Sequence, residues 1–405
     1  MSERLVGTVS RGIRCPIIRE GDDIAKIVTD SVLRAAEVHH FELNDRDVVA
    51  VTESVVARAQ GNYCTVDDIA ADIKAKLHGA DTVGVVYPIL SRNRFAICLR
   101  GIAKAVKKVI LMLSFPSDEV GNCLVSEESK KLALAPFFNI AYDRGGLLTE
   151  DDFRSAYKES RHPFTGMDYI EYYRNIIEDS GAEAEIVFGK YPHLILEKVK
   201  DVITCDIHTR KHSKKDLTET GANIVLGLDD IMTAPVNCSG YNKKYGLLGS
   251  NKASEDKVKL FPRDAQDTVL AIQAIFEKKT GKHIEVMVYG DGCFKDPVGK
   301  IWEFADPVVS PFYTDGLNGT PNELKLKYLA DNEFSNLSGE KLKEAIKKRI
   351  EEKDSDLFGK MASEGTTPRR ITDLLGSLCD LTSGSGDKGT PIVLIQGYFD
   401  NYITE

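Results

Sequence analysis

The chain has 405 residues, of which 42% are apolar and 28% are charged, and its formal net charge is -9. This length predicts two or three domains, or one core with a large insertion. The acidic balance excludes long-range attraction for nucleic acid, and no apolar run approaches the roughly 18 residues of a membrane helix. We therefore expect a cytoplasmic protein with no nucleic-acid or membrane partner. Eight scattered cysteines without a C-x-x-C pair are typical of reduced thiols.

The first predicted part, residues 1–75, combines strand and helix around a common core. Asp22 and Asp23 are typical capping residues, and apolar residues follow them at helical spacing. The β-branched run at 48–51 predicts a short strand that is buried on both faces.

A polar turn follows this strand and carries Thr52, Glu53 and Ser54, with Arg58 in the helical segment behind it. Hydroxyl and backbone N–H groups at a strand-to-helix turn suit a phosphate, and an arginine can bind one with two parallel hydrogen bonds. We interpret the segment as a candidate nucleotide-binding turn, with an ordinary turn as the alternative.

Residues 76–240 are predicted to form an inserted α/β block, because strand, amphipathic helix and strand patterns alternate twice. Its basic run, TRKHSKK at 209–215, is interpreted as a solvated loop rather than as an anion site. His208 and His212 are four residues apart, as zinc ligands on a helix would be, but the HExxH glutamate is absent and the surroundings resemble a loop.

The third predicted part, residues 241–405, begins with a loop rich in glycine and asparagine that holds Asn251. A helix is predicted between Asp264 at its start and Gly281 at its end. The apolar strand that follows, IEVMVY, delivers Asp291 to its C-terminal end.

The densest group of charged residues lies between Tyr289 and Pro311. Acidic side chains at the end of a buried strand often bind Mg²⁺ or Mn²⁺, which need only one or two carboxylates besides water and phosphate oxygens. Asp291 is the candidate metal ligand, and Lys295 and Lys300 are candidate substrate contacts. The alternative is a long polar loop whose acidic residues cap turns.

Near the C-terminus, the stretch GSGDKG at 384–389 has the glycine spacing of a dinucleotide-binding motif. A helix with Leu374, Leu375, Leu378 and Leu381 on its apolar stripe is predicted before it, and a strand is predicted after it. This order is the reverse of the dinucleotide-binding arrangement, so the spacing alone favours an ordinary turn.

Several segments, taken in order, resemble the deazaflavin coenzyme F(420):L-glutamate ligase family. The resemblance covers roughly residues 13–62 and 245–400 and leaves out the middle block. The segments that carry it are CPIIREGDDIAKIV, DVVAVTESVVARAQGN, YGLLGSNKAS, FPRDAQDTVLAIQAIFEKKTGKHIEVMVYGD and ITDLLGSLCDLTSGSGDKGTPIVLIQGY.

This resemblance implies a homodimeric enzyme of mixed α/β subunits that uses GTP and a divalent metal ion. A substrate carboxylate would be activated as an acyl phosphate, and the amine of glutamate would then displace phosphate to form an amide. Asp291 and Asn251 lie where the family has metal-binding aspartates. The residues on its nucleotide-binding turn and C-terminal glycine-rich loop are Thr52, Glu53, Ser54, Arg58, Gly384, Gly386 and Asp387.

The sequence also departs from the family pattern. The Thr-Asp-Thr-x-Gly-Arg run becomes YGDGCFK, Asn251 replaces a carboxylate, and Arg58 replaces a lysine. These changes leave open a different carboxylate acceptor, another amino acid as the amine, and ATP as the nucleotide. They also leave open a non-catalytic nucleotide-binding relative and a metal-dependent phosphohydrolase.

Overall fold

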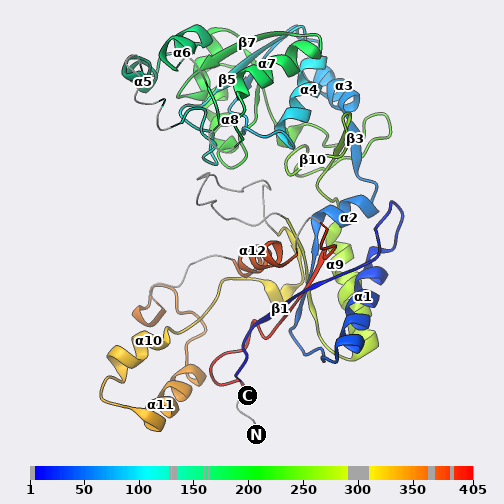
Figure 1. Cartoon of the computed structure of the whole chain (residues 1–405), viewed down its shortest axis with the longest axis vertical. Coiled ribbons are helices and arrows are strands. Elements are labelled where there is room, and N and C mark those ends of the chain that lie inside the picture. The colour runs from blue at the N-terminus through cyan, green and yellow to red at the C-terminus, as the bar shows by residue number, and fades with distance from the viewer. Residues whose placement is uncertain are drawn as a thin grey trace.

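The computed structural model describes residues 5–126, 129, 135–157, 160–162, 165–290, 310–363, 370–383 and 387–404. It confirms the predicted mixed α/β fold, because helices flank mixed sheets (Figure 1). A five-stranded sheet and a six-stranded sheet occupy opposite ends of the elongated molecule, and a small three-stranded sheet lies between them.

The five-stranded sheet combines strands from both ends of the chain in the order β1-β14-β2-β12-β13. Its central strand, β2, pairs in parallel with β12 and antiparallel with β14. The strand bounds are β1 Val9–Ile13, β2 Val48–Thr52, β12 Glu285–Tyr289, β13 Phe312–Tyr313 and β14 Ile392–Gln396.

Helices cover both faces of this sheet, as Figure 1 shows. Helices α1 (Ile24–His39) and α9 (Ala265–Thr280) pack on one face, and α12 (Ile371–Thr382) packs on the other. Alternate residues of β2 enter the two cores, so that Val49 and Val51 lie on the α1 and α9 side. Burial on both faces explains why this strand is continuously apolar.

The predicted helix starts and ends are largely confirmed. Asp23 caps α1, because its carboxylate accepts a hydrogen bond from the backbone N–H of Lys26 at 3.0 Å. Gly281 ends α9 with a φ of 69°, a left-handed conformation that glycine adopts without strain. Asp264 precedes α9 as predicted, but its side chain makes no capping hydrogen bond within the described residues.

The predicted apolar stripe of α12 is wrong at one position. Leu375 and Cys379 are fully buried against the sheet, whereas Leu381 is 68% exposed. At about 100° per residue, Leu381 lies roughly 200° around the helix from Cys379 and therefore faces away from the sheet. The order of helix, glycine-rich stretch and strand at 371–396 is as predicted.

The six-stranded sheet has the order β6-β7-β5-β4-β8-β9 and is parallel except for its edge strand β6. Counted along the chain, the parallel strands have the arrangement 3-2-1-4-5 of a doubly wound fold. The strand bounds are β4 Thr82–Val86, β5 Lys108–Leu113, β6 Leu148–Thr149, β7 Glu183–Phe188, β8 Asp201–Thr204 and β9 Ile224–Gly227.

Helices also flank this second sheet. Helices α3 (Val66–Lys76), α4 (Phe95–Ala105) and α7 (Tyr169–Asp179) enclose one core, and α8 (Arg210–Glu219) contributes to the core on the other face. The segment predicted as a second amphipathic helix is only a short 3-10 helix, Pro192–Glu197. The division of the chain at residues 75 and 240 stays a prediction, and the first core also includes residues from outside it, such as Val66 and Phe261.

The remaining elements are short or peripheral. The three-stranded sheet contains β10 (Asn251–Lys252), β11 (Lys257–Lys259) and β3 (Tyr63–Thr65) in that order. The other α-helices are α2 Glu53–Ala59, α5 Ala135–Asp143, α6 Glu150–Tyr157, α10 Leu326–Tyr328 and α11 Gly339–Glu351. In the described ranges, every helix is too short or too polar to cross a membrane.

Close packing between α3 and α4 depends on Gly101. A methyl group at this position would overlap Ile69, whose Cβ would lie only 2.7 Å away and whose side chain is fully buried. Gly101→Ala should lower the free energy of unfolding by about 1–3 kcal/mol, which urea denaturation can measure. Removing the nearest atom of the partner, Ile69 Cγ2, in Gly101→Ala/Ile69→Ala should make the double variant lose less stability than the sum of the two single variants. An unchanged Gly101→Ala variant would contradict the packing.

Candidate functional site

Three chain segments predicted to bind ligands meet at one edge of the five-stranded sheet. Because β2 and β12 are parallel, their C-terminal ends lie side by side, and Tyr289 pairs with Thr52. The backbone N–H of Thr52 donates to the carbonyl of Pro391 at 3.0 Å, which places the residues before β14 on the other side of β2. The hydroxyl-bearing turn therefore lies between the start of the 290–310 segment and the end of the glycine-rich stretch.

A cavity of about 410 Å³ opens at this edge. Gly290, which precedes the predicted metal ligand Asp291, lines it, and so does Gly389 at the end of GSGDKG. The predicted nucleotide and metal residues that line it are Thr52, Glu53, Ser54, Arg58 and Asn251. The structure thus brings together residues that lie almost 200 positions apart in the sequence.

The other predicted site residues are not placed in this cavity. Asp387 is exposed and is not among the residues that line it. The predictions for Asp291, Lys295, Lys300, Gly384 and Gly386 fall outside the described residues.

Glu53 forms a buried ion pair at the start of α2. Its Oε1 lies 2.6 Å from Nζ of Lys259 in β11, and the two side chains are only 6% and 8% exposed. The charged groups of a buried ion pair lose their hydration. Their mutual attraction offsets this cost only while the two groups stay in contact. The pair therefore fixes the hydroxyl-bearing turn against the three-stranded sheet.

A second cavity of about 590 Å³ adjoins the first and shares Ser54, Arg58 and Asn251 with it. Its other charged lining residues are Glu20, Lys252, Lys257 and Lys259. Positive charge therefore predominates, which suits phosphate groups.

The three-stranded sheet builds the floor of this second cavity. Asn251 pairs with Lys259, and Lys259 pairs with Tyr63, so the three residues form one row across the strands. Burial raises the pKa of the Tyr63 phenol, although the nearby Arg58 guanidinium acts in the opposite direction. Arg58 is exposed and faces both cavities.

The family model F420-0:Gamma-glutamyl ligase matches residues 12–397. The chain belongs to this family. The matched range runs across the middle block, which the segments of the resemblance did not cover. No curated protein shows significant sequence similarity to the chain.

Sequence reasoning missed two residues at the site of this family member. Lys259 gave no signal beyond the alternation in KVK, because its burial depends on Glu53, which is distant in sequence. Arg94 lines the 410 Å³ cavity from the start of α4, in the block predicted to be an insertion. The backbone N–H of Lys252 donates to the carbonyl of Asn93 at 2.7 Å and holds the two regions together.

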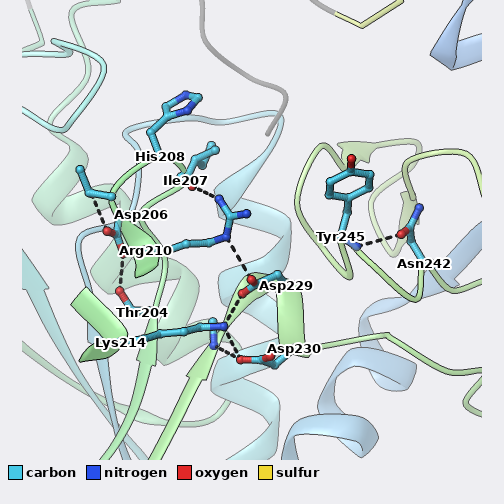
Figure 2. A network of polar contacts seen from close by, with 12 residues as sticks. Thr204, Asp206, Ile207, His208, Arg210, Lys214, Asp229, Asp230, Asn242 and Tyr245 are labelled. Carbon is cyan, nitrogen blue, oxygen red and sulfur yellow. Dashed lines mark hydrogen bonds and ion pairs between the residues drawn. The ribbon is translucent and has the colours of Figure 1, made fainter. Parts of the chain in front are cut away.

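The basic run at 209–215 is not the solvated loop that we expected. Most of it lies in the first turns of α8, and Figure 2 shows Arg210 and Lys214 directed toward Asp229. Arg210 Nε lies 3.0 Å and Lys214 Nζ 2.7 Å from oxygens of this carboxylate. Burial alone would raise the pKa of Asp229, but the two cations hold it below its ordinary value. These ion pairs explain the basic run as a structural feature of the block.

The described residues contain no group of three or more His, Cys, Asp or Glu side chains that could hold a metal ion. His212 lies on α8 and is exposed, rather than in a loop-like segment. Asn251 is the predicted metal ligand that the structure places, and this residue lines both cavities. Asp291 follows Gly290 directly in the chain.

Proposed function

We propose that this member of the family is a nucleotide- and metal-dependent ligase that joins a carboxylate acceptor to the amine of glutamate. Family membership supports a ligase of the gamma-glutamyl class. The observation that carries the finer proposal is the pairing of β2 with both β12 and β14, which brings Thr52, Gly290 and Gly389 to one cavity. GTP is the expected nucleotide, with ATP as the alternative.

Two bond exchanges make up the proposed reaction. An oxygen of the acceptor carboxylate attacks the terminal phosphorus of the nucleotide, and the nucleoside diphosphate leaves. The unprotonated amine of glutamate then attacks the acyl carbon, phosphate leaves, and the nitrogen loses a proton to give the amide. Both exchanges require positioning and neutralisation of phosphoryl oxygens more than covalent help from the protein.

The residues of the two cavities fit these requirements. Arg58 and Lys257 present cations to the 590 Å³ cavity, where they would bind and orient the phosphate chain. Ser54 lies where the two cavities meet, and its hydroxyl can donate a hydrogen bond to a phosphoryl oxygen. The phosphate chain would thus extend from the 590 Å³ cavity toward the carboxylate in the 410 Å³ cavity.

The proposed metal ligands are Asp291 and Asn251. A carboxylate and a carboxamide oxygen suit Mg²⁺ or Mn²⁺, whose remaining ligands are usually water and phosphate oxygens. When bound, the ion would supply positive charge to the transferring phosphoryl group. We also propose that the enzyme is homodimeric, as the family resemblance implies, and that it is cytoplasmic, as expected from the sequence composition.

Phosphate release tests this proposal against the two alternatives. The protein would be incubated with GTP or ATP and Mg²⁺ or Mn²⁺, with and without F420-0 and glutamate. Release that requires both substrates, together with amide product in mass spectrometry, is the expected result. Release without an acceptor would instead indicate a phosphohydrolase, and nucleotide binding without release would indicate a non-catalytic relative.

Arg58→Ala should raise the KM for the nucleotide by about tenfold to a hundredfold, because it removes a charge-assisted contact to phosphate. Arg58→Lys should lose less, since it keeps the charge but not the planar fork. Initial rates at varied nucleotide concentration would measure both effects. Lys74→Ala, on the exposed face of α3, is the control, and an Arg58→Ala variant that matches it would contradict the assignment.

A further inference from the structure

A third cavity, which no predicted site residue lines, adjoins the site. It has a volume of about 1130 Å³ and lies between the edge strand β1 and the helix α1. It shares Cys15, Pro16 and Thr390 with the 410 Å³ cavity. The 410 Å³ cavity therefore adjoins both of the other cavities.

This third cavity is strongly cationic. Its charged lining residues are Arg11, Arg14, Arg34 and Lys388, together with the titratable His39, and none of its described lining residues is acidic. Clustered cations are unexpected in a chain whose formal net charge is -9. A cavity lined by charge of one sign concentrates ligands of the opposite sign.

The cations of this cavity are available to a ligand. In the described part of the chain, neither Arg34 nor the Lys388 ammonium takes part in an ion pair. Arg14 donates from Nε to the carbonyl of Lys388 at 3.2 Å, which leaves its terminal nitrogens for other partners. Arg11 is the most constrained, because it donates to Gln396 Oε1 at 2.6 Å.

Apolar surface accompanies these cations. Ile13, Ala35, Val38 and Phe41 also line the cavity, and Val38 is largely exposed. A ligand that fits both features carries negative groups on an apolar or aromatic body. The amide-forming reaction needs such a molecule, since its acceptor must enter the 410 Å³ cavity as a carboxylate.

We propose that the 1130 Å³ cavity binds the carboxylate acceptor and selects one with additional negative groups, either phosphate or carboxylate. Arg14, Arg34 and Lys388 bind these groups, and the apolar body lies against Val38 and Phe41. The reacting carboxylate then passes Cys15 and Thr390 into the 410 Å³ cavity. This proposal rests on the proposed ligase function and adds to it the location and charge of the acceptor.

Charge reversal at Arg34 tests the acceptor site by equilibrium binding, which does not require turnover. F420-0 would be titrated by its fluorescence into wild type, Arg34→Glu and Lys388→Glu, and GTP with Mg²⁺ would be titrated separately by calorimetry. Each variant should weaken F420-0 binding by about tenfold or more and leave GTP binding unchanged. Lys278→Glu, an exposed reversal on α9, is the matched control and should bind both ligands like wild type.

Several outcomes would overturn this site. These are equal F420-0 affinity in wild type and Arg34→Glu, parallel loss of GTP binding, and no F420-0 binding by wild type. Dissociation of a dimer by Arg34→Glu in sedimentation would show instead that the cavity is an interface between copies of the chain. Titrations with pyrophosphate and with triglutamate distinguish phosphate from carboxylate recognition. F420-0 binding that depends on Arg34, without amide formation by wild type, would contradict the proposed function but support the site.

Discussion

Lys259→Met is expected to lower the free energy of unfolding by about 3–5 kcal/mol, because it removes the cation that lies beside the buried Glu53 carboxylate. The two groups lie 2.6 Å apart and are almost inaccessible to water. Methionine has similar length and an apolar character, so loss of charge rather than loss of packing should dominate. Urea denaturation followed by tryptophan fluorescence and circular dichroism would measure the change.

Two further variants separate charge from packing. Glu53→Met/Lys259→Met removes both charges and should recover most of the lost stability, since apolar replacement of a whole buried pair is often neutral. Lys257→Met, an exposed lysine on the same strand, should change stability little. A loss below 1 kcal/mol in the single variant at 259 would show that the pair does not hold the turn.

Asp291→Asn is expected to lower metal-dependent ligase activity by at least about a hundredfold and to abolish metal-dependent nucleotide binding. The proposed site already has an amide at Asn251, so this change would remove its remaining assigned carboxylate. Stability should stay near that of wild type. Mn²⁺ titration in the presence of GTP, read by calorimetry, would measure the binding.

Asn251→Asp provides the opposite test of the same site. It restores a negative ligand and should strengthen Mn²⁺ binding, because each carboxylate adds charge attraction for a hard cation. If Asp291→Asn binds GTP and Mn²⁺ as wild type does, the metal assignment is wrong. If only Asn251→Asp has no effect, the carboxamide lies outside the coordination shell.

Local sequence patterns predicted where the helices and strands lie better than which face each element buries and which residues it contacts. The β-branched run at 48–51 predicted a strand and Gly281 predicted a helix end, and both predictions are confirmed. Both depend only on the backbone preferences of residues close together in the sequence. The exposed side of α12 depends on how the helix meets a distant sheet, so Leu381 was assigned wrongly. The basic run at 209–215 was predicted wrongly for the same reason. Its ion-pair partner Asp229 lies in a separate 3-10 helix, Leu228–Asp230, which the local sequence did not connect with it.

The candidate site was predicted in its segments but not in its electrostatics. Thr52 and Ser54 could be found because a polar turn after an apolar strand is a local pattern. The cationic surroundings come from register between strands that are remote in sequence, such as the row of Asn251, Lys259 and Tyr63. Local patterns in a single sequence do not determine which residues pair between strands that are remote from one another.

The position of β14 also sets the order in which the protein can mature during synthesis. The strands of the six-stranded sheet all lie between residues 82 and 227, so this sheet can form while the rest of the chain is still being made. The five-stranded sheet must wait for residues 392–396, which pair with the central β2. A nascent chain that lacks β14 therefore exposes one edge of β2 and has no complete site. The cavity should be complete only after residues 392–396 have left the ribosome.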